Sequence, residues 1–452
     1  MTSARGYDDL SRTPSTVSSP SKTAPPGGAD HLPAEAYREL LTEARDRTLA
    51  LVMDVSDDDL ERVHDPLMSP LLWDLGHIAA YEDLWLCARA GGLEPLRPDL
   101  AEVYDAAETP RARRGDLPYL RRPEAIAYLG EVHERSLEVL ERADLSASGG
   151  RFVWEMVLQH EHQHNETMLQ TLQLAEPGVY SPRPRALPAA AVEAEGPVHV
   201  EAGPFVLGRD ARDFAYDNER PAHEVAVGAF EIGRLPVTNG AYLEFVESGG
   251  YSRREWWSEA GWEWRTREAI ERPLYWTADA SVRRFDRTEA LKPDLPVMHV
   301  SWYEADAYAR AQGKRLPTET EWEKAAAPRG ATAGARGYPW GGEPPDARRA
   351  NLGQTGFGPA AAGAYPAGAS ARGVLGLIGD AWEWTATEFT AYAGFEAFPY
   401  AEYSEVFFDA GYRVLRGGSW ATRPRVACST FRNWDLPQRR QIFAGFRCAR
   451  EA

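Results

Sequence analysis

The segment GRFVWEMVLQHEHQHNETMLQTLQLA, residues 150–175, carries the pattern from which the first half of the fold can be inferred. Its apolar residues recur every three or four positions, which predicts an amphipathic α-helix. Within it, HEHQHNE (160–166) places His160 and His164 one helical turn apart on one face, so both imidazoles can reach a single metal ion. His162 points roughly the other way.

The same helical spacing recurs in three earlier segments of the chain. They are AYRELLTEARDRTLALVMDV (36–55), PLLWDLGHIAAYEDLWLCARAGG (70–92) and AIAYLGEVHERSLEVLERA (125–143). Four long amphipathic helices predict an antiparallel four-helix bundle over residues 33–175. Residues 1–32 are rich in Ser, Thr, Pro, Gly and Ala, and are expected to form a disordered tail.

The character of the chain changes after the fourth helix. Residues 176–197 are rich in Pro and Ala without periodicity, which indicates a linker. Over 198–452, short alternating strands are separated by Gly, Pro and Asn turns, and only two clear helices are expected, at 238–250 and 302–313. Together with many tryptophans, this pattern predicts a loop-rich α+β domain.

Composition excludes several classes of function. The net charge of −18 argues against a nucleic-acid or anionic-membrane partner. Three cysteines without CxxC spacing indicate neither a disulfide framework nor a thiolate metal site. The sequence has no apolar run of about 18 residues and no apolar signal-peptide core at its start, so a cytoplasmic location is expected.

A third metal ligand has to come from outside the HxxxH helix. His77 lies in another predicted bundle helix with apolar residues on both sides, and is either a hydrogen-bonded core residue or a ligand. Beside the HxxxH pair, the ligand interpretation is favoured, although spacing alone does not distinguish zinc from iron. Glu166 is either a carboxylate that orients an imidazole or a solvated charge, and Gln163 is either an exposed helix residue or a donor to substrate.

Four motifs of the second half strongly resemble the formylglycine-generating-enzyme family. In order they are RLPTETEWEKAA (315–326), GDAWEWT (379–385), VLRGGSW (414–420) and FAGFRCAR (443–450). The bundle with its separated His and HxxxH resembles the DinB-like fold. This domain order, with HEHQHNE, PYAEYSEVFF (399–408) and FRNWDLPQRRQIFAGFR (431–447), resembles the ergothioneine-biosynthesis sulfoxide synthases over residues 33–452.

The resemblance implies a multidomain α and α+β fold, in which a DinB-like four-helix bundle precedes a C-type-lectin-like, formylglycine-generating-enzyme-like domain. It also implies an oxidoreductase that uses iron(II), bound by His77, His160 and His164, and O2. Such an enzyme forms a C–S bond between trimethylhistidine (hercynine) and a thiol, either γ-glutamylcysteine or cysteine. We expect these small molecules to be its partners and the chain to be a monomer.

The two substrates call for different side chains. Hercynine carries a quaternary ammonium and a carboxylate, and the resemblance places Gln163, Asn433 and Trp434 at this substrate. The two carboxylates and one amine of γ-glutamylcysteine require arginines and a carboxylate. The loop TPRARRGDLPYLRR (109–122) offers candidates, and Asp435 with Arg439 follows Trp434. Two arginines three positions apart match the family, which indicates Arg111 and Arg114, with Arg113 as an alternative.

A proton donor must direct the reaction toward sulfoxide and away from oxidation of the thiol to a sulfinate. By resemblance, Tyr400 in PYAEYS matches the catalytic tyrosine of the family, and Tyr403 lines the same pocket. Without the resemblance, either residue would be read as an ordinary tyrosine of a surface loop.

Three other functions compete with this hypothesis. A zinc-dependent thiol S-transferase would also use a DinB-like bundle, and a Trp-rich binding module would have no catalytic metal. Copper bound by Cys428 and Cys448 would follow the formylglycine-generating enzymes, but no paired-thiolate motif is present. The related ovothiol-forming enzymes usually carry a methyltransferase domain, and no Gly-rich nucleotide-binding unit follows FAGFR, so ergothioneine chemistry is favoured.

Overall fold

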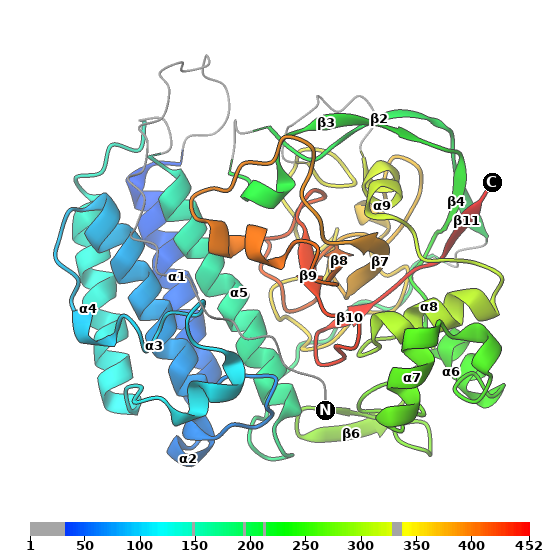
Figure 1. Cartoon of the computed structure of the whole chain (residues 1–452), viewed down its shortest axis with the longest axis horizontal. Coiled ribbons are helices and arrows are strands. Elements are labelled where there is room, and N and C mark those ends of the chain that lie inside the picture. The colour runs from blue at the N-terminus through cyan, green and yellow to red at the C-terminus, as the bar shows by residue number, and fades with distance from the viewer. Residues whose placement is uncertain (1–31, 147–149, 193–195, 211–213, 328–336) are drawn as a thin grey trace, which may run out of the picture.

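The computed structural model describes residues 32–146, 150–192, 196–210, 214–327 and 337–452. Figure 1 shows a bundle of long helices beside a domain of short strands, helices and loops, as the resemblance implied. The tail predicted for residues 1–32 lies outside the described residues, apart from Leu32. No helix in the described part of the chain is long and apolar enough to cross a membrane.

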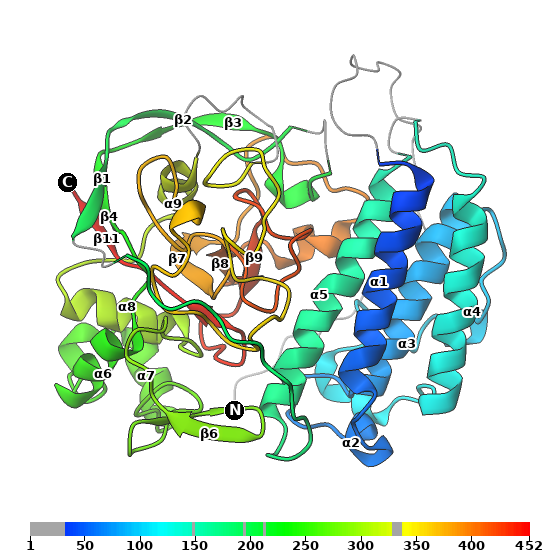
Figure 2. The same ribbon diagram turned by 180° about the vertical axis from the view of Figure 1, so that it is seen from behind.

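The first domain consists of long helices that pack through apolar faces. They are α1 (Ala34–Val52), α3 (Leu71–Glu82), α4 (Arg122–Leu140) and α5 (Phe152–Leu174), with the short α2 (Asp57–Glu61) between α1 and α3. Helix α5 contacts both α1 and α3, and His160 on α5 lies against His77 on α3. Figure 2 shows α5 on the side of the bundle that faces the second domain.

The helix predicted at 70–92 is not α-helical throughout. After Glu82 it continues as a π-helix, η1, over Asp83–Ala90, and the chain turns at Gly92, which has a φ of +66°. A π-helix has a wider turn than an α-helix, so side chains beyond Glu82 are rotated from the positions that α-helical spacing predicts. This rotation affects the part of the helix that follows His77.

The described residues of the second domain form four small sheets. One has the order β1 (Pro197–Val200), β4 (Phe230–Gly233), β11 (Ala449–Glu451), and another β10 (Ala444–Gly445), β7 (Trp382–Glu388), β8 (Arg413–Arg416), β9 (Asn433–Asp435). Two hairpins pair β2 (Gly203–Leu207) with β3 (His223–Val227), and β5 (Ser281–Arg284) with β6 (Arg287–Ala290). Strand β11 pairs antiparallel with β4, so the end of the chain lies beside the start of this domain.

In the part of this domain that the structure describes, four helices longer than one turn accompany these strands, whereas the sequence indicated two. The expected ones are α6 (Asn239–Glu247) and α8 (Trp302–Ala311), and the additional ones are α7 (Glu259–Arg267) and α9 (Glu319–Ala326). Helix α9 begins with a capping box, in which Thr318 accepts from the Glu321 N–H and the Glu321 carboxylate accepts from the Thr318 N–H. The T-x-x-E signature was therefore present in the sequence.

The sequence motifs of the second domain meet in its interior. The Glu383 carboxylate of GDAWEWT accepts hydrogen bonds from Trp322 Nε1 at 2.7 Å and from Arg447 Nε at 2.7 Å. Arg416 of VLRGGSW pairs with Glu323 of the first motif, and both are buried. Fully buried ion pairs need such complete pairing, because an unpartnered charge in the interior is costly. These motifs therefore hold the domain together.

A carboxylate of helix α5 joins the two domains. Glu166 is buried, and its oxygens accept from Trp382 Nε1 at 2.8 Å, from Ser419 Oγ at 2.6 Å and from Thr422 Oγ1 at 2.6 Å. Glu166 is therefore neither of the two alternatives that the sequence left open, since it is not solvated and all three donors belong to the other domain. The helix that carries two histidines is thereby fixed against the second domain.

Candidate metal centre

His77 lies on α3 and is almost completely buried. Its Nδ1 lies 2.7 Å from the backbone oxygen of Tyr104, which can only accept a hydrogen bond. Nδ1 therefore carries the hydrogen of the neutral ring, and Nε2 presents a lone pair toward α5.

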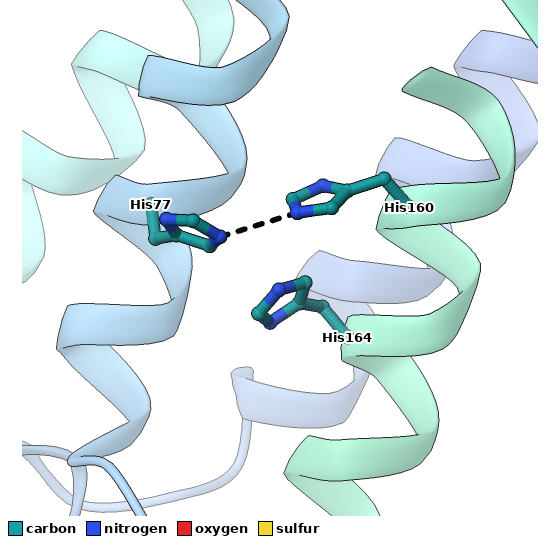
Figure 3. A group of neighbouring side chains, drawn as sticks. All are labelled: His77, His160 and His164. Carbon is teal, nitrogen blue, oxygen red and sulfur yellow. Dashed lines mark hydrogen bonds between the residues drawn. The ribbon is translucent and has the colours of Figure 1, made fainter. Parts of the chain in front are cut away.

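His160 and His164 extend from successive turns of α5 toward His77 (Figure 3). Nε2 of His77 lies 3.1 Å from Nε2 of His160, and one nitrogen from each of the three residues lies within 4.8 Å of the others. Burial holds the pKa of His77 and of His160 well below the usual value, and the neighbouring histidines lower both further. Both rings are therefore neutral and can act as ligands.

The Nδ1 side of His164 faces a buried carboxylate. Nδ1 of His164 lies 3.3 Å from Oδ1 of Asp74, which is 1% exposed and lies on α3 one turn before His77. A carboxylate behind a metal-bound imidazole orients the ring and increases its basicity. Helix α3 therefore supplies both one candidate ligand and the group that orients another.

The three histidines fit a transition-metal ion. Two nitrogen ligands that bind one ion at about 2.1 Å, with an angle of about 90–109° between them, lie about 3.0–3.4 Å apart. The separation of 3.1 Å between His77 Nε2 and His160 Nε2 falls within this range. Three imidazole ligands leave coordination positions open, which suits either zinc or iron.

A loop of the second domain brings Tyr400 close to the histidines. The Tyr400 hydroxyl lies 3.1 Å from the hydroxyl of Tyr81, and the Tyr81 ring stacks on His160 with centroids 3.7 Å apart. Burial raises the pKa of Tyr400 to about 12, although the hydrogen bond with Tyr81, for which either hydroxyl can be the donor, lowers it. Tyr400 thus keeps its proton at neutral pH and can donate it.

The residues predicted for hercynine lie along the same boundary between the domains. Gln163 Nε2 donates to the Tyr216 hydroxyl at 2.7 Å, and the Tyr216 ring stacks on Tyr403 with centroids 4.3 Å apart. Trp434 on β9 packs edge-on against Tyr403 at 6.0 Å. Gln163 is therefore linked to Trp434 through two tyrosines, and Asn433, which accepts from the Trp434 N–H, precedes it on β9.

The arginines of the 109–122 loop differ from one another. Arg114 is buried against the Trp73 ring, and its guanidinium donates to Thr109 O, Ser69 Oγ and Ala106 O. Arg111 and Arg113 are exposed. These contacts show Arg114 shaping the loop, whereas Arg111 remains accessible.

Asp435 and Arg439 form an ion pair with an N–O distance of 3.6 Å. Burial raises the pKa of Asp435, and the positive charges of Arg439 and Arg111 act in the opposite direction. Arg111 from the bundle loop and the Asp435–Arg439 pair from the second domain are therefore close enough to interact.

Several residues of the site were missed from the sequence. Tyr81 and Asp74 lie one turn after and one turn before His77, so helical spacing could have found them. Tyr216 and Asp217 carried no such signal. Asp217 is completely buried and accepts from Ser404 Oγ at 2.5 Å and from the Phe398 N–H at 3.3 Å, which anchors the loop that carries Tyr400.

Other candidate positions do not join this cluster. The three cysteines are buried and not disulfide-bonded, and Cys428 Sγ contacts Glu219 and Thr430. A cavity of about 400 Å³ lies between the linker and the β5–β6 hairpin, and none of the three histidines lines it. The chemistry of the histidines, rather than this cavity, identifies the site.

Comparison with known proteins gives two families in the same order along the chain. The Sulfatase-modifying factor enzyme 1-like domain family matches residues 183–452, and the DinB superfamily matches residues 40–168. Identity to the hercynine oxygenase of Mycolicibacterium thermoresistibile is 48%, covering 92% of this chain and 94% of that protein. Identity to the hercynine oxygenase of Mycobacterium tuberculosis is 49%, covering 90% of this chain and 97% of that protein. Identity to the hercynine oxygenase of Mycolicibacterium smegmatis is 45%, covering 92% of this chain and 98% of that protein.

Proposed function

The chain belongs to the hercynine oxygenase family, and from this premise we propose that it is an iron(II) enzyme that joins hercynine to γ-glutamylcysteine with O2. The observation that carries the proposal is the convergence of His77, His160 and His164 beside a tyrosine of the other domain. The product is a sulfoxide on the route to ergothioneine.

The reaction consumes all four oxidising equivalents of O2. Formation of the C–S bond removes two electrons, and oxidation of sulfur to sulfoxide removes two more. One oxygen atom enters the sulfoxide, and the other leaves as water with the hydrogens lost from the thiol and the imidazole ring. Iron(II), when bound by the three histidines, supplies the open positions and the redox chemistry through which O2 reacts.

Tyr400 is the proton donor in this proposal. Its buried hydroxyl is protonated at neutral pH and belongs to a loop that is anchored by Asp217. Delivery of its proton at the reacting oxygen favours sulfoxide formation over double oxygenation of the thiol to a sulfinate. The phenol then regains a proton from water.

Hercynine binding is assigned to the polar and aromatic groups along the domain boundary. One face of Trp434 stacks on Phe389 and one face of Tyr403 stacks on Tyr216. The other face of each ring suits a quaternary ammonium, because aromatic faces attract cations. The side-chain amides of Gln163 and Asn433 suit the carboxylate and the ring nitrogen. The hydrogen bond from Gln163 to Tyr216 supports a fixed orientation for that amide.

The thiol donor is assigned to the charged residues of the bundle loop and of the segment that begins with β9. Arg111 and Arg439 suit the two carboxylates of γ-glutamylcysteine, and Asp435 suits its ammonium group. In this arrangement Arg114 acts indirectly, by holding the loop against Trp73. Free cysteine, which has one carboxylate, would use fewer of these groups.

The proposal is tested by reconstituting the protein anaerobically with iron(II), hercynine and γ-glutamylcysteine, admitting air and analysing the products by mass spectrometry. We expect a sulfoxide adduct of both substrates, lost in His77→Ala and His164→Ala. It should persist in His199→Ala, which alters a half-exposed histidine of β1. An adduct with free cysteine alone would reassign the thiol.

The zinc-dependent thiol S-transferase is the second candidate, because three imidazole ligands also suit zinc. It predicts turnover with zinc in the absence of O2. A thiol-transfer product under those conditions, with no sulfoxide from the iron-loaded protein in air, would replace the oxygenase proposal.

A further inference from the structure

Tyr81 connects a candidate metal ligand to the candidate proton donor. It lies on α3 four residues after His77, and its ring stacks on His160 with an angle of 11° between the planes. Its hydroxyl lies 3.1 Å from the Tyr400 hydroxyl. One phenol therefore touches the histidine cluster with its face and the second-domain tyrosine with its oxygen.

The π-helix that follows Tyr81 builds the rest of this contact. With its wider turn, residues four positions apart remain on nearly the same side of the helix. Trp85 lies 6.0 Å from Tyr81 and 5.4 Å from Tyr400, measured between ring centroids, and the Arg89 guanidinium lies 4.1 Å from the Trp85 ring centroid. Tyr81 and Trp85 therefore both pack against Tyr400 from the bundle side.

We propose that Tyr81 is a positioning residue for Tyr400, donating a hydrogen bond to its oxygen and thereby turning the Tyr400 hydroxyl hydrogen toward the substrates. Each hydroxyl has one hydrogen, so Tyr400 can give its own to the reaction only if Tyr81 is the donor within the pair. When the proton leaves, the electron pair stays on the Tyr400 oxygen. The hydrogen bond from Tyr81 then stabilises the phenolate until water returns a proton.

The charges around Tyr400 make this hydrogen bond important. Burial is the largest effect and raises the pKa of Tyr400, the charges of Asp217 and Glu402 raise it further, and the hydrogen bond with Tyr81 and the charge of Arg89 lower it. A buried phenolate near two carboxylates needs a hydrogen-bond donor, because a hydrogen bond to a charged group is stronger than one between neutral groups. The structure places the Tyr81 hydroxyl within hydrogen-bonding distance of that oxygen.

The catalytic part of the test rests on the proposed function. Tyr81→Phe keeps the ring on His160 and removes only the hydroxyl, so we expect iron(II) stoichiometry to be unchanged and the sulfoxide-to-sulfinate ratio to fall about tenfold or more. In a Tyr400→Phe background, Tyr81→Phe should have no further effect. An unchanged ratio, or additive effects of the two substitutions, would overturn the proposal.

The matched control is Tyr242→Phe, because Tyr242 and Tyr251 form a similar buried pair with hydroxyls 3.0 Å apart in the second domain. This substitution should leave the product ratio unchanged. Should Tyr81→Phe fail to fold, a ring-fluorinated tyrosine at position 81 keeps the hydroxyl and makes it a stronger donor. It should raise the sulfoxide-to-sulfinate ratio, and no change in that ratio would contradict the proposal.

A second measurement does not depend on activity or metal. With 3-fluorotyrosine at position 400, fluorine NMR follows ionisation of that phenol in the folded protein. Loss of the Tyr81 donor should raise the pKa at position 400 by about one unit, which is a tenfold change in its ionisation constant. An unchanged pKa would overturn the proposal even if sulfoxide is made, and the expected rise would support it even if the proposed reaction fails.

Discussion

The two sides of the histidine site are built differently. On the bundle side, the candidate ligands lie on α3 and α5, and Asp74 and Tyr104 support them from behind. On the other side, Tyr400 and Trp434 lie on a loop and a three-residue strand that depend on distant contacts such as Asp217–Ser404. Helical spacing therefore sets the geometry of the three histidines, and tertiary contacts set the position of Tyr400, the candidate proton donor.

Removal of a candidate metal ligand should distinguish the two sides of the site most strongly. In His160→Ala, two imidazoles remain, so we expect metal affinity to fall more than about 100-fold and sulfoxide formation more than about 1,000-fold. Iron content after dialysis and product yield measure the two effects. Normal iron content in this variant would show that His160 is not a ligand.

Removal of Asp217, which anchors the loop that carries Tyr400, should lower the sulfoxide yield and leave iron binding unchanged. In Asp217→Ala the Ser404 hydroxyl and the Phe398 N–H lose their acceptor, so Tyr400 shifts while the bundle is untouched. We expect normal iron binding and a fall in sulfoxide yield of about 100-fold, the loss typical of a misplaced reacting group. A smaller fall is expected for Ser404→Ala, which removes one of these contacts, and none for the exposed-loop variant Asp346→Ala.

If iron content in Asp217→Ala fell in parallel with sulfoxide yield, the two sides of the site would not be independent.

Acid should weaken the second domain through His299. Burial lowers the pKa of His299 to about 3, and its Nδ1 hydrogen-bonds to the backbone oxygen of Arg440. The unfolded chain, with a histidine pKa near 6.5, binds the proton more readily, so this contribution to stability is present above pH 6.5 and decreases as the pH falls. Between pH 7 and pH 5 the loss is about 2 kcal/mol.

His299→Asn keeps a donor for that oxygen and tolerates the φ of +61° at this position. In urea unfolding at pH 7 and pH 5, the variant should lose about 2 kcal/mol less than the unchanged protein. Equal losses would show that His299 does not titrate on unfolding.

The smallest effect on activity is expected from substitutions of arginines in the 109–122 loop of the bundle. Arg111→Ala should raise the KM for γ-glutamylcysteine about tenfold with an unchanged melting temperature, because Arg111 is exposed. Arg114→Ala should lower the melting temperature by several degrees, because it leaves Ser69 and two carbonyls without their donor. Reversed results would exchange the roles of the two arginines.

The parts of the site that the sequence indicated share one property, which is local spacing. The pair His160 and His164 follows from the 3.6-residue period, and the bundle follows from four segments with that period. Tyr400 and Trp434 were found through the family resemblance, because no local pattern distinguishes a loop tyrosine beside a metal site from any other. The roles of all these residues remain predictions.

Other features of the structure could not be predicted from local spacing in the sequence. The π-helix at Asp83–Ala90 depends on packing, and it turns Trp85 toward Tyr400. Glu166 looked like a solvated or ligand-orienting carboxylate because its three donors come from the other domain, more than 200 residues away in sequence. A single sequence shows the acceptor and not the distant donors.

We propose that the bundle binds the metal and that the second domain supplies the proton donor. This proposal is tested most directly by measuring iron content and products in one preparation of Tyr400→Phe. We expect the same iron(II) stoichiometry and comparable O2 uptake, with product diverted from the sulfoxide to the sulfinate of the thiol. An unchanged yield of sulfoxide would contradict the role of Tyr400 as proton donor. Loss of iron would contradict the assignment of metal binding to the bundle alone.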